Sequence, residues 1–326
     1  MYKIAKPLFL HCQTAMHAGT GDDLGIVDLP IQREKHTGYP KIEASGLKGA
    51  IRESFEENAA SVNDRVKLHV VFGYDEVDAK RKPYPITGEF QDKESRDFAG
   101  AIGFTDARII LFPLKSLKGI FAYATCPSVL KKLKRELQDI CEFSMDIETG
   151  FDIDVTKVAV ANPPHLSNNN KTILEEYSFD CSQVALNEQA AKLAGQLNKL
   201  LGIPDLDKKL IVLEDDTFAD FVKNSTEVVT RIKINNETGT VAKGALFTEE
   251  YLPAECVMYS LVLASHVFAP SKKDYFGAGE SQNVMTYFAD TLKDVIQIGG
   301  SATLGKGIVK TIKTKLKDAS TTVTQA

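Results

Sequence analysis

VVTRIKINNETGTVAKGALFTEEY, residues 228–251, is the stretch from which the fold class of this chain can be read most directly. Two runs in which apolar and polar residues alternate flank the polar turn NNETGT at residues 235–240. Alternation with a period of two is typical of β-strands, and a short turn rich in Asn, Gly and Thr joins antiparallel neighbours. The sequence therefore predicts a β-hairpin here, and with it an antiparallel sheet.

On both sides of the hairpin, strand-like and helix-like segments interleave without the regular alternation of a doubly wound parallel sheet. The predicted strands cover residues 4–12, 102–112, 119–125, 172–179, 210–213, 256–268 and 308–315. The predicted helices cover residues 45–60, 127–137, 185–202, 215–224 and 283–296. We expect an α+β fold with an antiparallel sheet and large insertions, as a single domain over residues 1–326 with a disordered tail at 317–326.

The helix at 45–60 has an apolar face and a basic one. Its apolar face carries Leu47, Ala50, Ile51 and Phe55. Ser45 is placed to act as the N-cap, and Lys48 and Arg52 lie one turn apart on the opposite face. A cationic face that begins at a helix N-terminus suits phosphate groups, although a solvated face is the alternative. The polar segment that follows, residues 73–98, reads as a mobile insertion without an assignable role.

Composition places the chain among ordinary globular proteins, with 43% apolar and 25% charged residues. Five scattered cysteines without Cys-x-x-Cys spacing argue against a disulfide framework and a zinc site. The apolar run near the N-terminus is too short for a signal peptide, so we expect a cytoplasmic protein without a membrane segment.

Charge is distributed unevenly, although the net charge is only −5. Residues 115–135 contain six basic residues and no acid, whereas residues 136–154 contain seven acids and no base. One explanation is a solvated helix followed by an acidic loop. The other is head-to-tail self-association into a filament, in which the basic face of one copy meets the acidic face of the next.

Residues 17–40, HAGTGDDLGIVDLPIQREKHTGYP, follow neither the strand nor the helix period, so we expect a long loop. Long loops inside compact domains usually bind or catalyse something. Asp28 lies in a sterically restricted apolar segment, where a carboxylate could bind a divalent ion or accept a proton. A turn aspartate is the alternative for Asp28, and a structural histidine is the alternative for His17 at the loop entrance.

Two further motifs are candidates for chemistry. GSATLGKG at residues 300–307 matches seven positions of a phosphate-binding loop, but it ends in Gly307 and precedes a predicted strand. It therefore argues against an ATPase, while Gly305 and Lys306 remain candidates for contacts to RNA phosphates, or for a tight turn. In TEEYLP, Glu249 and Tyr251 share one strand face, which suits proton transfer or simple alternation at a surface.

Together, HAGTGDDLGIVDLPIQREKHTGYP, SGLKGAIRESF, the hairpin stretch and IQIGGSATLGKGIVK closely resemble the backbone subunits that the RAMP superfamily contributes to type III-B CRISPR complexes, called Cmr complexes. The resemblance spans nearly the whole chain. It implies an RRM-like palm of ferredoxin-like topology and a projecting thumb hairpin at residues 231–250. It also implies antiviral defence as the setting.

By position, the resemblance makes Asp28 the catalytic aspartate, with His17, Glu249 and Tyr251 as further catalytic residues. We also expect Asp28 to be the metal ligand. The resemblance also places Lys48 and Arg52 on the helix that holds guide phosphates, and we expect Ser45 at the start of this helix to take part. Further RNA-binding candidates come from the residues themselves: Gly305 and Lys306 in the glycine-rich motif, and Leu246 and Phe247, apolar groups of the hairpin that can separate stacked bases. The expected partners are guide crRNA, target RNA, further copies of this chain and other subunits of the complex.

The expected activity is that of an endoribonuclease that depends on a divalent metal ion, Mg²⁺ or Mn²⁺. It would cleave the target RNA at regular intervals within the assembled complex. A non-catalytic scaffold that only coats the guide RNA is the alternative, and the sequence does not separate the two.

Overall fold

The computed structural model describes residues 2–21, 25–91, 98–234 and 237–313, so the expected disordered tail at 317–326 lies outside the described residues. Its central element is a ten-stranded sheet in the order β13-β14-β1-β12-β4-β5-β9-β6, with β2 paired to β4 and β3 paired to β12. The described strands of this sheet are β1 Ile4–Cys12, β2 Lys41–Ile42, β3 Ile102–Phe104, β4 Ala107–Lys115, β5 Phe121–Thr125, β6 Ala159–Val160, β9 Leu210–Val212, β12 Val257–Ala264, β13 Val295–Gln297 and β14 Ile308–Ile312. All of its described pairings are antiparallel except β5 with β9, which confirms the predicted α+β class.

Both faces of the sheet are buried. In β1, Leu8 and Leu10 join one apolar core and Phe9 between them joins the other, because successive side chains of a strand point to opposite faces. Strand β1 pairs with β12 from Ile4↔Ala264 to His11↔Val257, and its other edge pairs with β14. The first and the last described strands of the chain therefore lie side by side, next to the β13 edge of the sheet.

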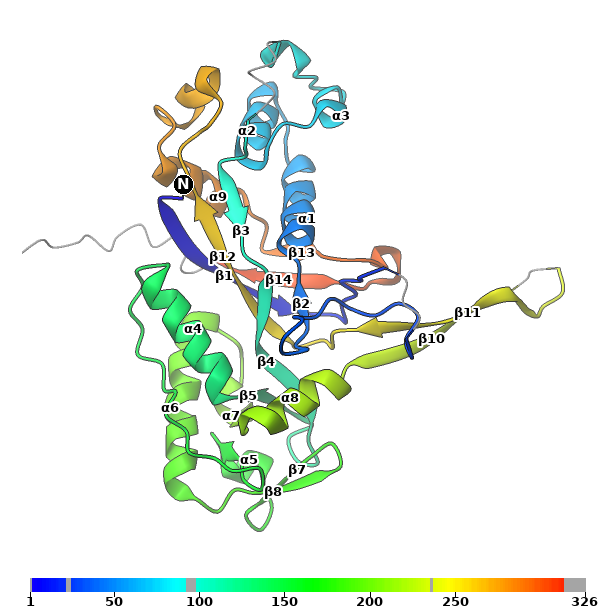
Figure 1. Ribbon diagram of the computed structural model, residues 1–326, viewed down its shortest axis with the longest axis vertical. Coiled ribbons are helices and arrows are strands. Elements are labelled where there is room, and N and C mark those ends of the chain that lie inside the picture. The colour runs from blue at the N-terminus through cyan, green and yellow to red at the C-terminus, as the bar shows by residue number, and fades with distance from the viewer. Residues whose placement is uncertain (1, 22–24, 92–97, 235–236, 314–326) are drawn as a thin grey trace, which may run out of the picture.

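Helices cover the two cores separately. α1 (Ala44–Glu56) and α9 (Ser281–Thr291) contribute to the core that contains Leu8. α4 (Pro127–Asp139) and α6 (Val184–Leu201) contribute to the core that contains Phe9. Figure 1 shows the two pairs toward opposite ends of the molecule. The other described helices are α2 Val62–Phe72, α3 Glu76–Ala79, α5 Pro163–Leu166, α7 Leu206–Lys209, α8 Asp215–Asn224 and the short 3₁₀ turns η1 Thr87–Glu89, η3 Pro270–Phe276 and η4 Ala302–Leu304.

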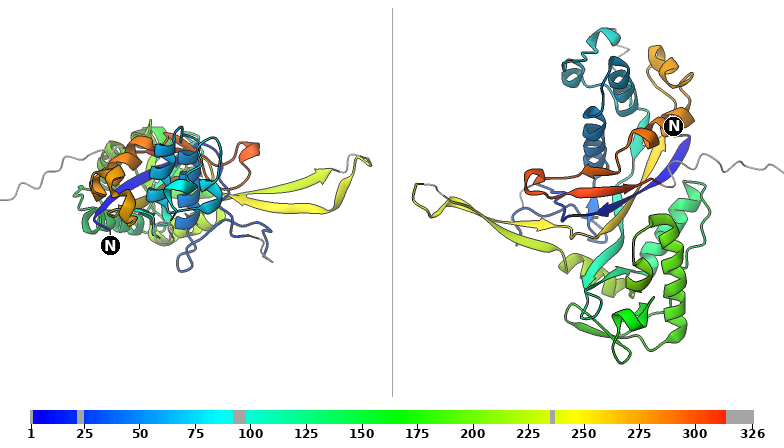
Figure 2. Two further views of the ribbon diagram at one scale, coloured as in Figure 1. Left: turned by 90° about the horizontal axis from the view of Figure 1, so that it is seen from above. Right: turned by 180° about the vertical axis from the view of Figure 1, so that it is seen from behind.

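The predicted hairpin is confirmed as β10 (Glu227–Ile234) and β11 (Val241–Tyr251), which pair only with each other in the two-stranded sheet they form. Their register places Thr230 opposite Thr248 and Arg231 opposite Phe247. Seen from above, the hairpin extends far from the body of the molecule (Figure 2). Only its base can therefore be held by contacts with the rest of the chain.

Several helix boundaries follow from local signals that the sequence displays. Pro127 opens α4, a position where its missing N–H costs nothing. Gly202 ends α6 in a left-handed conformation with φ of 58°, which glycine adopts without strain. α8 spans the predicted residues 215–224.

Several predicted elements are wrong in their bounds. The helix predicted at 45–60 ends at Glu56, and the strand predicted at 256–268 ends at Ala264. Residues 172–179 form two strands, β7 (Lys171–Leu174) and β8 (Tyr177–Asp180), because Glu175 takes a left-handed turn conformation. The helix predicted at 283–296 ends at Thr291, and the chain then adds β13 to the sheet. The strand predicted at 102–112 breaks between β3 and β4.

Ser45 is the predicted N-cap of α1, but Asp106, which lies in the break between β3 and β4, binds the start of the helix instead. The N-cap position is Glu43, without a side-chain cap, and Ser45 lies exposed within the helix. Asp106, between β3 and β4, accepts a hydrogen bond from the Ala44 amide at 2.9 Å and another from Lys41 Nζ at 2.9 Å. A residue distant in sequence thus satisfies the helix end.

The insertion expected to be mobile is anchored over its described part. Ile86 and Phe90 are buried, and the Asp78 carboxylate binds Arg65 at 2.8 Å and His69 at 3.0 Å. Burial, with the nearby charge of Arg52, lowers the pKa of His69 to about 4. Residues 92–97 of the same prediction lie outside the described residues.

The basic and acidic blocks are neighbours in space. Lys134 Nζ in α4 donates a hydrogen bond to the carbonyl of Ile147 at 3.1 Å. Glu136 binds Arg108 at 3.0 Å, and Lys132 binds Glu34 at 3.3 Å. Part of each block is therefore compensated within the chain, and head-to-tail contact between the blocks stays a prediction.

The packing of α9 on the sheet generates a stability prediction. The Phe288 ring is fully buried and lies 5.6 Å from the ring centroids of both Phe55 and Phe104. Phe288→Ala should lower the free energy of unfolding by about 3–5 kcal/mol, because it leaves a cavity between α1, α9 and the sheet. Val184→Ala, at a side chain that is 68% exposed, is the control and should change it by less than about 0.5 kcal/mol. Urea unfolding followed by circular dichroism measures both, and similar small losses would contradict this packing.

Candidate active site at the base of the hairpin

The edge of β11 that faces away from β10 holds two segments of the opening loop. The Leu29 amide donates to the Thr248 carbonyl at 3.0 Å, and the Glu250 amide donates to the Leu29 carbonyl at 3.0 Å. Met16 and Leu252 exchange two further backbone bonds of 2.9 and 2.8 Å. Asp28 and His17 are thereby fixed beside positions 248 and 250, about 7 Å apart along the strand.

Asp28 is exposed, and one residue of the hairpin orients its carboxylate. Its Oδ2 accepts hydrogen bonds from the Thr248 amide at 2.7 Å and from Thr248 Oγ1 at 2.8 Å, and its own amide donates to Thr248 Oγ1 at 3.0 Å. These bonds, the backbone bond first, hold the pKa of Asp28 below its ordinary value. The group is therefore an anion at neutral pH, and no described residue binds its second oxygen, Oδ1.

His17 is held in one tautomer. Its Nδ1 lies 2.7 Å from the Glu250 carbonyl oxygen, and because a carbonyl can only accept, Nδ1 carries the proton. Its Nε2 then lies 3.9 Å from Glu249 Oε1. In the neutral ring Nε2 holds the lone pair, so it is the atom that can accept and return a proton.

Two glycines make room for His17. A side chain at Gly19 would place its Cβ 2.5 Å from His17 Nε2, and one at Gly299 would place it 2.2 Å from the His17 carbonyl oxygen. Gly299 also has φ of 84°, in the left-handed region. The Gly300 amide donates to the same carbonyl at 2.9 Å. The glycine-rich segment therefore packs directly against the histidine.

Glu249 and Tyr251 share one face of β11, as predicted, but both are buried, so the expectation of simple alternation at a surface is wrong. The Tyr251 hydroxyl donates to Glu249 Oε2, and Arg231 binds both: Nε to Glu249 Oε2 at 3.2 Å and Nη2 to the hydroxyl at 2.5 Å. Ser301 donates to Glu249 Oε1 at 3.1 Å. Burial alone would raise the pKa of Glu249, but the bonds from Tyr251 and Ser301 and the charge of Arg231 lower it.

Glu250 projects to the opposite face and has a separate arginine. Its Oε1 accepts from Arg33 Nη2 at 2.5 Å and from the Thr226 hydroxyl at 2.6 Å, and its Oε2 accepts from the Ile31 amide at 3.0 Å. This group ties the opening loop to the hairpin a second time.

The glycine-rich loop lies over the Glu249 face. Lys306 Nζ is 4.6 Å from the centroid of the Tyr251 ring, and Gly305 is left-handed with open space where a side chain would project. Strand β14 follows at Ile308, as predicted, and the loop before it contains the three-residue 3₁₀ turn η4.

The other RNA-binding candidates lie on α1 and farther along the hairpin. On α1, Lys48 is half-buried, without an ion pair to any described carboxylate, and burial with the neighbouring charge of Arg52 lowers its pKa. Arg52 is engaged inside the chain, with Nε 2.7 Å from Glu56 Oε1 and Nη1 donating to the Gly73 carbonyl at 3.0 Å. On the hairpin, Leu246 is 65% exposed, and Phe247 projects from the opposite face.

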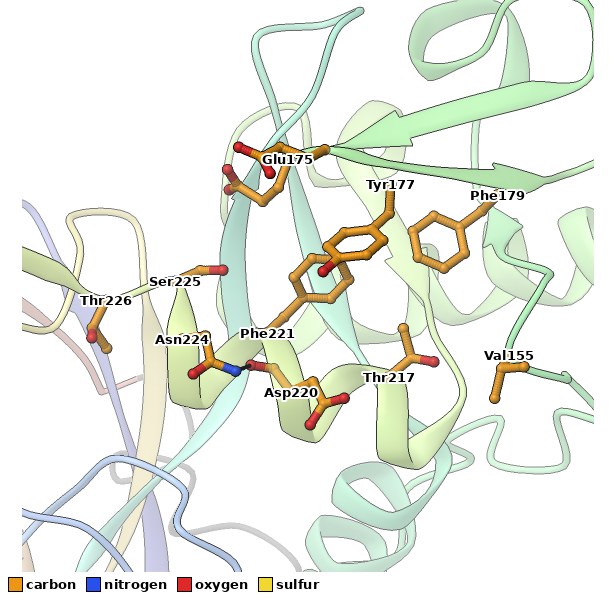
Figure 3. A pocket seen from close by; sticks show the side chains of 11 residues that line it. Val155, Glu175, Tyr177, Phe179, Thr217, Asp220, Phe221, Asn224, Ser225 and Thr226 are labelled. Carbon is orange, nitrogen blue, oxygen red and sulfur yellow. Dashed lines mark hydrogen bonds between the residues drawn. The ribbon is translucent and has the colours of Figure 1, made fainter.

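A separate cavity of about 590 Å³ lies between the β7–β8 hairpin and α8 (Figure 3). Three carboxylates line it, those of Glu175, Glu176 and Asp220, and no basic side chain does among the described residues. It contains none of the predicted site residues. Its charge makes it unsuitable for a phosphate backbone.

Comparison with known proteins identifies the family of this chain. The family model of the RAMP superfamily matches residues 9–310. The chain belongs to the RAMP superfamily. It is 35% identical over 322 residues to the CRISPR system Cmr endoribonuclease Cmr4 of Pyrococcus furiosus, covering 92% of each chain.

Solved RAMP structures agree with the fold. A crystal structure of oligomeric Cmr4 from Pyrococcus furiosus superposes with a TM-score of 0.67 at 26% identity, covering 94% of this chain and 96% of that one. A type III-B Cmr-beta cryo-EM structure in the apo state gives 0.65 at 26% identity, covering 95% and 97%.

Four residues of this RAMP site were not singled out as candidates in the sequence. Arg231, Ser301, Thr248 and Arg33 all bind the acidic residues of the cluster. Only Arg231 had a detectable signal. It pairs with Phe247 across the hairpin, and Phe247 lies on the same strand face as Tyr251, four residues further on. The others reach the site through contacts that no local pattern encodes.

Asp28 is the one exposed carboxylate in the described part of this cluster that a metal ion could use as a ligand, because Glu249 and Glu250 are buried. Among the described residues, no three His, Cys, Asp or Glu side chains gather closely enough to form a metal site. Asp28 Oδ1 is still a suitable ligand, because Mg²⁺ is commonly held by one or two carboxylates together with substrate phosphates and water.

The five cysteines are free and buried. No helix in the described part of the chain is both long and apolar enough to cross a bilayer.

The Arg231 contacts generate a prediction about stability and pH. Arg231→Gln should lower the free energy of unfolding by about 1–3 kcal/mol at pH 7, because Glu249 would remain charged and buried without its cation. The lowered pKa of Glu249 means that its stabilising contribution is complete above its ordinary value of 4.5 and is lost as the pH falls through the folded-state pKa.

The difference between wild type and Arg231→Gln should therefore shrink below about pH 4.5. Urea unfolding at pH 7 and pH 4 measures it. Lys80→Gln, which breaks the exposed pair with Glu76, is the control and should change little at either pH. A difference that grows on acidification would mean that Glu249 is not the partner that matters.

Proposed function

We propose that this chain is the backbone subunit of a type III-B CRISPR effector complex, where it binds guide RNA and cleaves complementary target RNA at regular intervals. The observation that carries the proposal is the pair of Asp28 and His17, fixed side by side along one edge of β11 at the base of a projecting hairpin. The endoribonuclease named among its relatives supports the activity.

The palm of this subunit is RRM-like. The strand order β14-β1-β12-β4 supports it, because β1 with α1 and β12 with α9 then form two β-α-β halves of a ferredoxin-like unit. Hairpin β10–β11 is the thumb, and its length and isolation from the sheet support that role.

Cleavage proceeds by attack of the substrate's own 2′-hydroxyl on the adjacent phosphorus. The new P–O2′ bond forms as the P–O5′ bond breaks, the 2′-hydroxyl proton is removed, and the leaving 5′-oxygen receives a proton. The products are a 2′,3′-cyclic phosphate and a 5′-hydroxyl. DNA lacks the nucleophile and is not cut.

The residues divide this work according to their exposure. Asp28, exposed and anionic, activates the nucleophile or holds the divalent ion, Mg²⁺ or Mn²⁺. When bound, the ion supplies charge neutralisation at the phosphate. His17 Nε2 is positioned to transfer a proton. Glu249 and Tyr251 are both buried and bound by Arg231, and they position the histidine: Tyr251 packs edge-on against its ring, and Glu249 Oε1 lies 3.9 Å from its Nε2.

RNA is held by basic and apolar groups around the cluster. Lys48, near the start of α1 with Ser45, contacts guide phosphates, and Arg52 braces that helix while adding charge. Gly305 and Lys306 approach the target backbone at the site. Leu246 and Phe247 act on the thumb, where apolar groups can separate stacked bases.

The partners are guide and target RNA, other subunits of the effector complex and further copies of this chain. A relative that crystallises as an oligomer supports the last of these. Lys131 and Arg135 are exposed on α4, and they bind an acidic face of the next copy. The setting is the cytoplasm, where target RNA is found.

Asp28→Asn tests the catalytic role. In the reconstituted complex, target affinity should be unchanged, while the rate of cleavage falls by about 10²–10⁴-fold because the charged group that assists the reaction is lost. Chelation by EDTA should stop wild-type cleavage, and Mn²⁺ should restore it. Asp216→Asn, on the exposed face of α8, is the control and should cut at the wild-type rate. Full cleavage by Asp28→Asn would leave a guide-coating scaffold as the function.

A second prediction concerns the thumb. Deleting residues 235–240 shortens the hairpin and removes its tip while leaving Asp28 and Thr248 in place. Because unstacking a base costs a few kcal/mol that the thumb must supply, cleavage should lose its regular spacing or cease. Product lengths on a denaturing gel measure this, and unchanged sites and rates would show that the hairpin tip has no part in setting the cut.

A further inference from the structure

We infer that Thr248 is the positioning residue for Asp28, so that the thumb hairpin itself carries the aspartate into place. This inference rests on the proposed function of Asp28. It adds a residue of the hairpin to the cleavage machinery, and it makes the position of the reacting group depend on the hairpin's base.

The contacts support this assignment because Thr248 meets Asp28 in both directions. The threonine hydroxyl donates to Asp28 Oδ2 at 2.8 Å while it accepts from the Asp28 amide at 3.0 Å. The Thr248 amide supplies a second donor to Oδ2 at 2.7 Å. A hydroxyl is the side-chain group that can do both at this distance. Valine, with the same shape, can do neither.

Little else holds this part of the loop. Asp28 is exposed, and the Ile26 side chain before it has no burial at all, with a relative exposure of 101%. Burial resumes only at Ile31, whose amide binds Glu250 Oε2. Between these points, the described side-chain bonds of the segment are those between Asp28 and Thr248 and one from Thr20 Oγ1 to the Pro30 carbonyl at 3.4 Å. Without the Thr248 hydroxyl, the aspartate would keep the bond from the Thr248 amide and its backbone connection at Leu29, but it would lose two of the three bonds that fix its direction.

Position 230 offers a matched control. Thr230 lies directly opposite Thr248 in the same ribbon and is exposed. Within the described chain, no hydrogen bond of its hydroxyl reaches the opening loop. A substitution at Thr230 therefore has the same effect on strand propensity as one at Thr248 but leaves Asp28 untouched.

The experiment uses the reconstituted complex with Thr248→Val, Thr248→Ser, Thr230→Val and Asp28→Asn. Thr248→Val should lower the single-turnover cleavage rate by about 10- to 100-fold, the usual cost of losing a group that orients a reacting residue. Target affinity and cleavage sites should stay unchanged. Thr248→Ser, which restores the hydroxyl, should cut within about twofold of wild type, and Thr230→Val should cut normally.

Hydrogen exchange on the purified full-length chain provides a readout apart from activity. Residues 25–31 should exchange faster in Thr248→Val, because the Asp28 amide loses its acceptor, and at the wild-type rate in Thr248→Ser and Thr230→Val. If Thr248→Val fails to fold by circular dichroism, Thr248→Ala is measured against the same criteria.

The outcomes separate the inference from the proposed function. If Asp28→Asn cuts normally, the proposed function fails whatever Thr248 does. If Asp28→Asn is inactive while Thr248→Val retains the wild-type rate and exchange, the function stands and the positioning role is overturned. Equal losses in Thr248→Val and Thr230→Val would likewise overturn it, because the effect would then belong to the ribbon.

Discussion

At the base of the hairpin, both edges of strand β11 form backbone hydrogen bonds, and the rest of the site depends on these bonds. One edge pairs with β10, and the other binds two separate segments of the opening loop. The same alternation that places Asp28 and His17 along the edge sends Glu249 and Glu250 to opposite faces. A shift of one residue in this register would exchange the two faces and dismantle the site.

Two adjacent carboxylates are buried where the hairpin leaves the body, and each has its own arginine. Arg231 meets Glu249 from within the hairpin, whereas Arg33 meets Glu250 from the loop. An unpaired buried carboxylate would cost several kcal/mol. The hairpin base and the opening loop are therefore expected to fold as one unit, because the cation of the buried Glu250, Arg33, lies in the loop.

The sequence predicted what local patterns encode and missed what distant contacts decide. Proline at 127, glycine at 202 and the alternation in the hairpin fixed their elements correctly. Ser45 failed as a cap because Asp106 arrives from another part of the sheet. Asp28 and His17 stood out only through their unusual loop and the family resemblance, while Thr248 and Ser301 look like ordinary polar residues until the fold brings them together.

The pairing of β1 with β12 has a consequence for how the chain is made. His11 lies beside Val257 in the sheet, so the first strand synthesised must wait for a partner nearly 250 residues later. At ordinary translation speeds of about 5–20 residues per second, that interval lasts roughly 10–50 s. During it, β1 has neither of its neighbours, since β14 emerges later still. Nascent chains thus expose an apolar strand edge on the ribosome, where chaperone binding is most useful.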